Sequence, residues 1–242
     1  CGLPRANIVV FDRFSTGLAE AGYTAARCPG VRIEGMQIID EEGRGFRDAQ
    51  VTHRSAANFD REVYYFAKGI EGKGVKGYKD DEFYLNQHVF NGEYSYFGTL
   101  VTKKLTKIVN LAVFKNTGPG ISMATKNIGY GVLCNTGRLH GPLGFRVNTH
   151  VHAASAVRDK LVLNVPDGLR GQYDGGPMAN EQFMWEHRRL YFATDPFALD
   201  AACQQIIAAK RREMGIVTVD HPRYTDYLRE AEKLGLGVGE PP

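Results

Sequence analysis

The strongest hydrophobic pattern in the chain is the apolar run from Ile108 to Phe114, which only Asn110 interrupts. A short run of this kind, rich in β-branched residues and bounded by turn signals, is typical of a buried strand in an α/β sheet. A glycine-containing loop follows, and a short helix is predicted over residues 122–128. Because loop and first-turn N–H groups have no partner inside the helix, this order of elements suits the binding of an anion. An ordinary strand-to-helix connection has the same pattern, and the GxxxxGK(S/T) spacing of a Walker loop is absent.

Further strands and helices are predicted on both sides of this run. Apolar and alternating runs predict strands over residues 7–11, 31–33, 37–39, 61–67, 161–165 and 189–193. Helices are expected over residues 15–21, 98–106, 155–160 and 222–234. Asp195 and Pro196 form a strong helix start, and the apolar spacing that follows predicts a helix that ends near Gly215.

The alternation of strands and helices from residue 108 onward favours an α/β fold, with a mostly parallel sheet and helices on both of its faces. We expect a single domain over residues 1–242, truncated at its N-terminus because Cys1 leads almost directly into a strand. An aromatic-rich insertion is expected at about residues 40–97. The aromatic density of its last part, residues 78–97, is more typical of packing or of a partner surface than of a base-stacking platform, since interleaved basic residues are sparse.

The composition is that of an ordinary globular protein, and it argues against two classes of function. Of the 242 residues, 43% are hydrophobic and 24% are charged, and the formal net charge is +3. This mild charge does not favour nucleic-acid binding, and the basic cluster Lys210-Arg211-Arg212 falls where the end of a helix is predicted. No apolar run approaches the ~20 residues of a membrane span.

Residue types that bind metals are present, but not at the spacing of a known metal site. The four cysteines are scattered and form no CxxC pair, so neither an iron–sulfur cluster nor a zinc ribbon is predicted. Buried free thiols are favoured over a disulfide between Cys1 and Cys28. His150 and His152 would point to one face of a strand, which permits metal ligation. No third ligand is indicated, so core or surface histidines are favoured there.

Polar residues follow several of the predicted strands. They are Asp12-Arg13, Lys115-Asn116, Asp167 with the loop from Arg170 to Asp174, and Asp195. In parallel sheets ligands bind outside the carboxyl ends of the strands, so we expect these groups to meet in one cleft. A mixture of aspartate, lysine and arginine suits a small anionic substrate, with a divalent metal held by carboxylates as a further possibility. A lysine whose pKa is shifted by burial also serves acid–base chemistry.

These considerations assign three sets of candidate residues. The catalytic set is Asp12, Lys115, Lys126 and Asp167. The substrate-binding set is Arg13, Asn116, Asn127, Arg138, His140 and Arg170. The metal-binding set is Asp12, Asp167 and Asp174.

An ordered set of motifs runs along nearly the whole chain: NIVVFDR, LAEAGY, KIVNLAVFKN, ATKNIGYG, NTGRLHG, VRDKLVLNVPDGLRGQYDGGP and ATDPFALDAACQQII. This set resembles the bacterial family called domain of unknown function 362. The family's central motif resembles a strand that ends in a lysine, a histidine-bearing loop, and an Ala-Leu-Lys-Asn helix. Lys115, Lys126 and Asn127 match it, whereas Asn116 and Thr117 stand where members often have an acidic residue and a histidine.

The resemblance also implies a location and two functional hypotheses. Some family members are fused to iron–sulfur ferredoxin modules, and the branch with FDR and QYDGGP signatures resembles proteins exported by a twin-arginine signal. A periplasmic or extracytoplasmic location and a missing N-terminal segment are therefore implied. The first hypothesis is a metal-assisted or redox-linked enzyme that acts on a small anionic molecule. The second is a non-catalytic structural or interaction subunit of a larger extracytoplasmic assembly, which binds a protein partner through residues 78–97.

Overall fold

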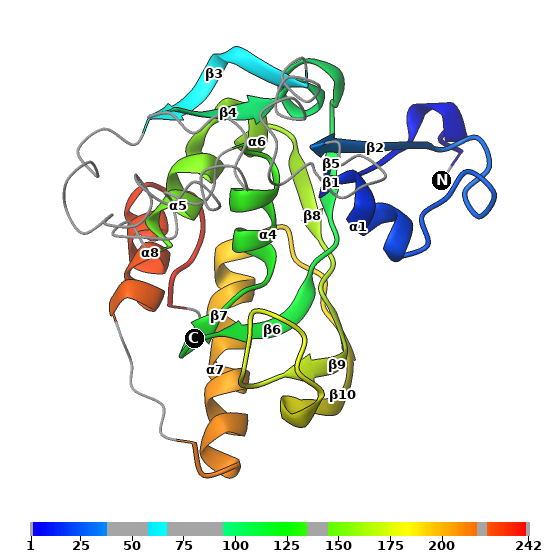
Figure 1. Cartoon of the computed structure of the whole chain (residues 1–242). Coiled ribbons are helices and arrows are strands. Elements are labelled where there is room, and N and C mark those ends of the chain that lie inside the picture. The colour runs from blue at the N-terminus through cyan, green and yellow to red at the C-terminus, as the bar shows by residue number, and fades with distance from the viewer. Residues whose placement is uncertain (1, 38–57, 67–93, 135–144, 217–221, 241–242) are drawn as a thin grey trace, which may run out of the picture. The chain divides into compact units, whose positions relative to one another are not determined.

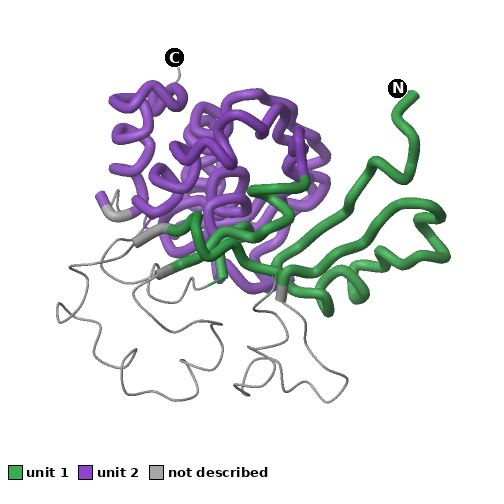
Figure 2. The backbone as a smooth tube through the Cα atoms, turned by 90° about the horizontal axis from the view of Figure 1, so that it is seen from above, with its two compact units in different colours: residues 1–104, 131–142 green, residues 105–130, 143–242 purple. Residues whose placement is uncertain are grey.

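The computed structural model of the chain describes residues 2–37, 58–66, 94–134, 145–216 and 222–240. The chain divides into two compact units, which are described separately here (Figure 2). Unit 1 comprises residues 1–104 and 131–142, and unit 2 comprises residues 105–130 and 143–242. The single domain expected from the sequence stays a prediction, and most of the insertion expected at about residues 40–97 lies outside the described residues.

Unit 1 is built on two pairs of strands. They are β1 (Val9–Phe14) with β2 (Arg32–Gln37), which are parallel, and β3 (Phe59–Phe66) with β4 (Tyr94–Gly98), which are antiparallel. Three short helical segments accompany them, η1 (Arg5–Asn7), α1 (Ser15–Glu20) and the π-helical turn η3 (Leu100–Lys104). The helix predicted after β1 is confirmed, and Gly22 follows it with a φ of +82°. Met36, Phe59 and Cys134 form the small buried core described for this unit.

Unit 2 contains six strands among its described residues. They are β5 (Ile108–Asn110), β6 (Val113–Thr117), β7 (Gly120–Ile121), β8 (Leu161–Asn164), β9 (Asp167–Gln172) and β10 (Met184–Leu190). The run predicted as one strand forms two, because β5 pairs with β8 and β6 pairs with β9, each in parallel. Two hydrogen bonds bridge the break: Val165 N–H donates to Asn110 O (2.8 Å) and Asp167 N–H to Ala112 O (2.7 Å).

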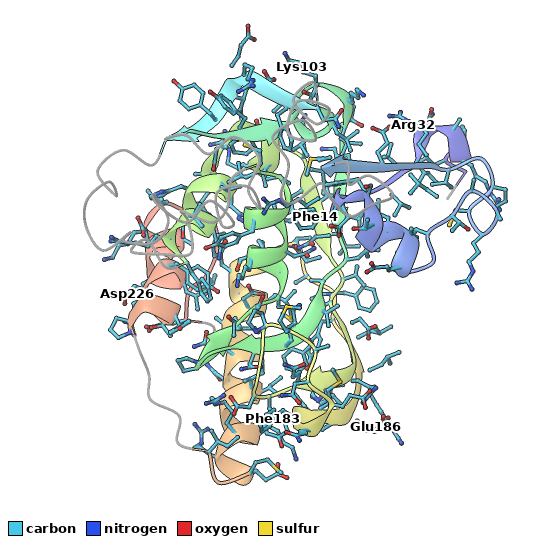
Figure 3. All side chains as sticks on the ribbon, viewed as in Figure 1. Phe14, Arg32, Lys103, Phe183, Glu186 and Asp226 are labelled. Atoms are coloured by element: carbon cyan, nitrogen blue, oxygen red, sulfur yellow. The ribbon has the colours of Figure 1, made fainter. Side chains whose placement is uncertain are left out.

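The sheet containing β6 is mixed rather than mostly parallel. Its order is β10-β9-β6-β7, and only β6 and β9 run parallel to each other. The α/β class is therefore confirmed, but the parallel character predicted for the sheet is met only in part. The loop expected from Arg170 to Asp174 lies partly in β9, and the chain then turns back into β10. Phe183 and Glu186 lie on this returning part of the chain (Figure 3). Gly171 lets the hairpin close, since a Cβ there would lie 2.4 Å from the Trp185 ring.

The helices of unit 2 are α4 (Ala124–Gly131), α5 (Arg146–Ala153), α6 (Ser155–Arg158), α7 (Pro196–Glu213) and α8 (Pro222–Lys233). The strand expected at His150 and His152 is wrong, because both lie in α5, where residues two apart point about 200° from each other. His150 Nε2 lies 3.3 Å from the Glu230 carboxylate on α8. His152 is buried and its Nδ1–H donates to Asn148 O (2.7 Å); burial lowers the pKa of His152 to about 4.

Helix α7 packs on β6 and β7 (Figure 1). The core between them contains Ala112, Phe114, Ile121, Met123, Ala124, Leu199, Cys203 and Ile207. Leu199, Cys203 and Ile207 belong to the helical stripe predicted from the sequence, so the packing face of α7 is confirmed. Cys134 and Cys203 are buried free thiols and Cys28 is a partly exposed one. Within the described ranges, no helix has the length and hydropathy needed to cross a membrane.

Asp195 fixes both the start of α7 and the C-terminal tail. Its Oδ1 accepts hydrogen bonds from the N–H groups of Phe197 (2.8 Å) and Ala198 (3.0 Å), which confirms the predicted helix cap. Its Oδ2 accepts a further hydrogen bond from Val238 N–H (2.8 Å). Gly237 lies against the same carboxylate, because a Cβ there would come within 2.3 Å of Oδ1.

Replacement of Asp195 tests this double role. Asp195→Ala is expected to lower the free energy of unfolding by about 2–3 kcal/mol, because a helix cap and the anchor of the tail are lost together. Urea denaturation followed by circular dichroism measures the change. The control is Asp159→Ala, at an exposed surface position with an expected change within ~0.5 kcal/mol. Equal effects for the two variants would contradict the role of Asp195.

Candidate functional site

Two lysines of unit 2 share one electrostatic environment. Lys115 lies in β6 and Lys126 in α4, and both side chains are half-buried. Burial lowers the pKa of Lys115, and burial together with the positive charge of Lys115 lowers the pKa of Lys126 to about 8. Among the described residues neither ammonium group has a carboxylate partner. We call these two residues the lysine pair.

Aromatic rings surround the end of Lys126. Its Nζ lies 5.4 Å from the centre of the Tyr130 ring and 5.0 Å from the centre of the Phe145 ring. Ring faces at this distance stabilise an ammonium by about 0.5–2 kcal/mol. This attraction favours the charged form, whereas desolvation and the positive charge of Lys115 lower the pKa of Lys126 to about 8.

The N-terminus of α4 does hold an anion, but the anion is part of the protein. The carboxylate of Asp200, in α7, accepts hydrogen bonds from the N–H groups of Ala124 (2.8 Å) and Thr125 (2.9 Å) and from the Thr125 hydroxyl. Asp200 is fully buried. The sequence pattern therefore identified an anion-binding helix start correctly, but an external ligand does not have access to these N–H groups.

Burial is also what sets the protonation of Asp200. Desolvation raises the pKa of this carboxyl to about 6, although its three hydrogen bonds oppose the shift. The sequence analysis assigned no site role to Asp200. Its burial could have been predicted from the sequence, because Asp200 lies on the apolar stripe of α7, three residues before Cys203 and seven before Ile207.

A chain of amides, of which Asn110 and Asn164 are buried and Asn127 is exposed, links α4 to the neighbouring strands. Asn127 Nδ2 donates to Asn110 Oδ1 (2.7 Å), and Asn110 Nδ2 donates to Asn164 Oδ1 (2.9 Å). Asn164 Nδ2 donates in turn to Ala193 O (3.2 Å). Asn127, predicted to bind substrate, therefore has its amide N–H group engaged within the protein. Asn110 and Asn164 were not predicted, although Asn110 was visible as the polar interruption of an apolar run.

Asn116 holds the turn after β9 against β6. Its side chain is fully buried, its Oδ1 accepts from Gly176 N–H (3.0 Å), and its Nδ2 donates to Gly118 O (3.0 Å). Both ends of this amide thus have partners in the protein. Substrate binding by Asn116 stays a prediction.

The acidic and basic residues of β9 do not converge. Asp167 is exposed at the first residue of β9 and accepts from Leu169 N–H (2.9 Å), and Arg170 is exposed within the same strand. Asp174 lies beyond the other end of the strand, where it pairs with the guanidinium of Arg211. That guanidinium also donates to Tyr173 O (3.2 Å). The strand thus separates two aspartates that were predicted to share a metal.

The remaining predicted site residues lie in unit 1 or outside the described residues, so none of them is assigned to the lysine pair. Asp12 and Arg13 belong to unit 1, where they lie inside β1 and not at its end. Asp12 is exposed, and Arg13 is buried and donates to Cys134 O. Arg138 and His140 lie outside the described residues. In the part of the chain that is described, no group of three or more His, Cys, Asp or Glu side chains is arranged to hold a metal.

The protonation of Asp200 gives a pH test of this core. Because its folded-state pKa (about 6) exceeds the ordinary 3.8, the folded chain keeps a proton there that the unfolded chain has lost. The free energy of unfolding should therefore fall by about 3 kcal/mol as the pH rises from about 4 to about 6. Asp200→Asn should lose this part of the pH dependence, as measured by urea denaturation at several pH values, whereas Asp159→Asn should keep it. An unchanged slope in Asp200→Asn would contradict the assignment.

Comparisons with known proteins agree with the motif resemblance. The family model described as "Domain of unknown function (DUF362)" matches residues 36–205. Searches of curated proteins and of solved structures found no significant match. The matched segment is more than half of the chain and includes both members of the lysine pair, so this chain belongs to the DUF362 family.

Proposed function

We propose that this chain binds a small anionic molecule at the lysine pair and that Lys126 transfers a proton at that molecule. The observation that carries the proposal is the pairing of two half-buried lysines for which the described residues supply no carboxylate. Buried charges are ordinarily paired, so two adjacent cations without a carboxylate among the described residues favour an anion as their partner. The rings of Tyr130 and Phe145 lie beside the ammonium group of Lys126.

The lowered pKa suits Lys126 to acid–base work near neutral pH. With a pKa of about 8, roughly one molecule in ten carries the neutral amine at pH 7, against fewer than about one in a thousand for an ordinary lysine. General acids and bases are most effective when their pKa lies near the working pH. Lys115 contributes a positive charge that attracts the anion and that, second to burial, lowers the pKa of Lys126.

The metal-assisted and redox-linked forms of this enzyme hypothesis have different support. The described residues offer no group of metal ligands, so the metal at Asp12, Asp167 and Asp174 gains no support from them. Redox linkage and a periplasmic or extracytoplasmic location rest on the family resemblance. Proton transfer at a bound anion requires neither of them.

The binding part of the proposal is tested with sulfate, whose charge does not change near neutral pH. Isothermal titration calorimetry should find that Lys126→Met and Lys115→Met each weaken sulfate binding by about tenfold, the loss of about 1.4 kcal/mol. Lys107→Met is the matched control, because Lys107 is exposed in the same unit, and it should bind like the unaltered protein. Equal affinities in all four proteins would refute the site.

The pH dependence of the same binding tests the role of Lys126. Sulfate affinity should fall as the pH rises through about 8, because the ammonium of Lys126 loses its charge there. In Lys115→Met the midpoint should move to higher pH, since the repulsion that lowers the pKa of Lys126 is removed. A midpoint that stays in place would show that Lys115 does not act on Lys126.

A further inference from the structure

The amine of Lys126 has surroundings that suit nucleophilic chemistry as well as proton transfer. Its Nζ lies 5.4 Å from the centre of the Tyr130 ring and 5.0 Å from the centre of the Phe145 ring. Among the described residues no carboxylate pairs with this amine. A carboxylate partner would favour the ammonium form, in which the nitrogen has no free lone pair. Without such a partner, the neutral amine of Lys126 is able to react as a nucleophile.

The backbone of α4 fixes where this amine lies. Lys126 is the third residue of α4, and the N–H groups of the first two residues donate to the buried carboxylate of Asp200 (2.8 and 2.9 Å). The side chain extends from this anchored turn to Phe145, the residue directly before α5. It is half-buried, so a small molecule has access to it. A fixed and accessible position is what a covalent catalyst needs, because the reacting atoms have to be held close together.

Two features activate the lysines that form imines with carbonyl compounds. Such a lysine is either desolvated in an apolar pocket or placed next to another cationic group, and both conditions favour its neutral amine. Lys126 meets both conditions, because aromatic rings adjoin its amine and the charge of Lys115 acts on it. Lys115 has no carboxylate partner among the described residues either. A molecule that suits the lysine pair therefore carries a negative group for Lys115 and an electrophilic carbon for Lys126.

We propose that the anion bound at the lysine pair is a small 2-oxo acid and that Lys126 forms an imine with its carbonyl carbon. This inference rests on the proposed anion site and names its substrate class. A carbonyl joined directly to a carboxylate is the smallest molecule that offers both required groups. The amine nitrogen bonds to the carbonyl carbon, the carbon–oxygen bond breaks, and both amine hydrogens leave with that oxygen as water. The step therefore consumes no oxidant or reductant, and the protons that Lys126 transfers are its own.

Reductive trapping with pyruvate tests this assignment. Pyruvate and sodium cyanoborohydride at neutral pH should place a carboxyethyl group on Lys126, which mass spectrometry of the digested chain locates. Methyl pyruvate has the same carbonyl without the negative charge. After both rates are normalised to those with free Nα-acetyl-lysine, pyruvate should label Lys126 about tenfold faster than the ester does. Lys115→Met should remove this preference, and the exposed control Lys107→Met should keep it.

Two further measurements separate the nucleophile from a cation that only binds. Sulfate should slow the labelling of Lys126, because it occupies the same site. Lys126→Arg keeps the positive charge but has no amine that forms an imine, so this variant should bind sulfate and give no adduct at residue 126.

The outcomes distinguish this inference from the anion site on which it rests. Sulfate binding at the lysine pair without an adduct on Lys126 would overturn the imine and leave the anion site in place. Absence of both sulfate binding and the adduct would refute the site as well. Labelling of Lys107 as fast as Lys126, or no preference for pyruvate over its ester, would also overturn the inference. Because the adduct is located in the unaltered chain, the test does not depend on the folding of any variant.

Discussion

The buried carboxylate of Asp200 is the interaction on which unit 2 most depends. A buried carboxylate loses its hydration, and three hydrogen-bond donors from α4 replace part of it. The same contact fixes where α4 begins relative to α7. Because Lys126 follows Thr125 directly, the position of its ammonium group depends on a carboxylate that it does not touch.

Other polar side chains in the core of unit 2 act in a similar way. The amides of Asn110 and Asn164 lie opposite each other on paired strands and share a hydrogen bond. A shift of one residue in either strand would turn the amide of that strand to the opposite face of the sheet and leave the other amide without its partner. Buried polar groups in this unit therefore specify register, and most of them have partners. The lysine pair is notable against this background because its charges have none among the described residues.

The position of the candidate site was only partly visible in the sequence. The motif around the apolar run drew attention to Lys115 and Lys126 through the spacing of a strand, a loop and a helix. Asp12 and Asp167 were assigned to the same site on the assumption that they follow strands. In the structure Asp12 lies within β1 and Asp167 begins β9, because the ends of a strand depend on the length of its pairing partner. A sequence read along one chain does not contain that partner.

The sequence by itself determined the elements whose signals are local: the cap and stripe of α7, the short helix α4, the apolar run, and the family. It also determined that lysines would follow that run. Only the tertiary structure decided that Asp200, 75 positions beyond Thr125, fills the anion site of α4, that the sheet is mixed, and that Val109, Leu111 and Val113 are exposed. The physical reason is the distance along the sequence over which each interaction acts. Capping and periodicity act within a turn or two of the chain, whereas burial, strand pairing and pKa values are set by residues that only folding brings into contact.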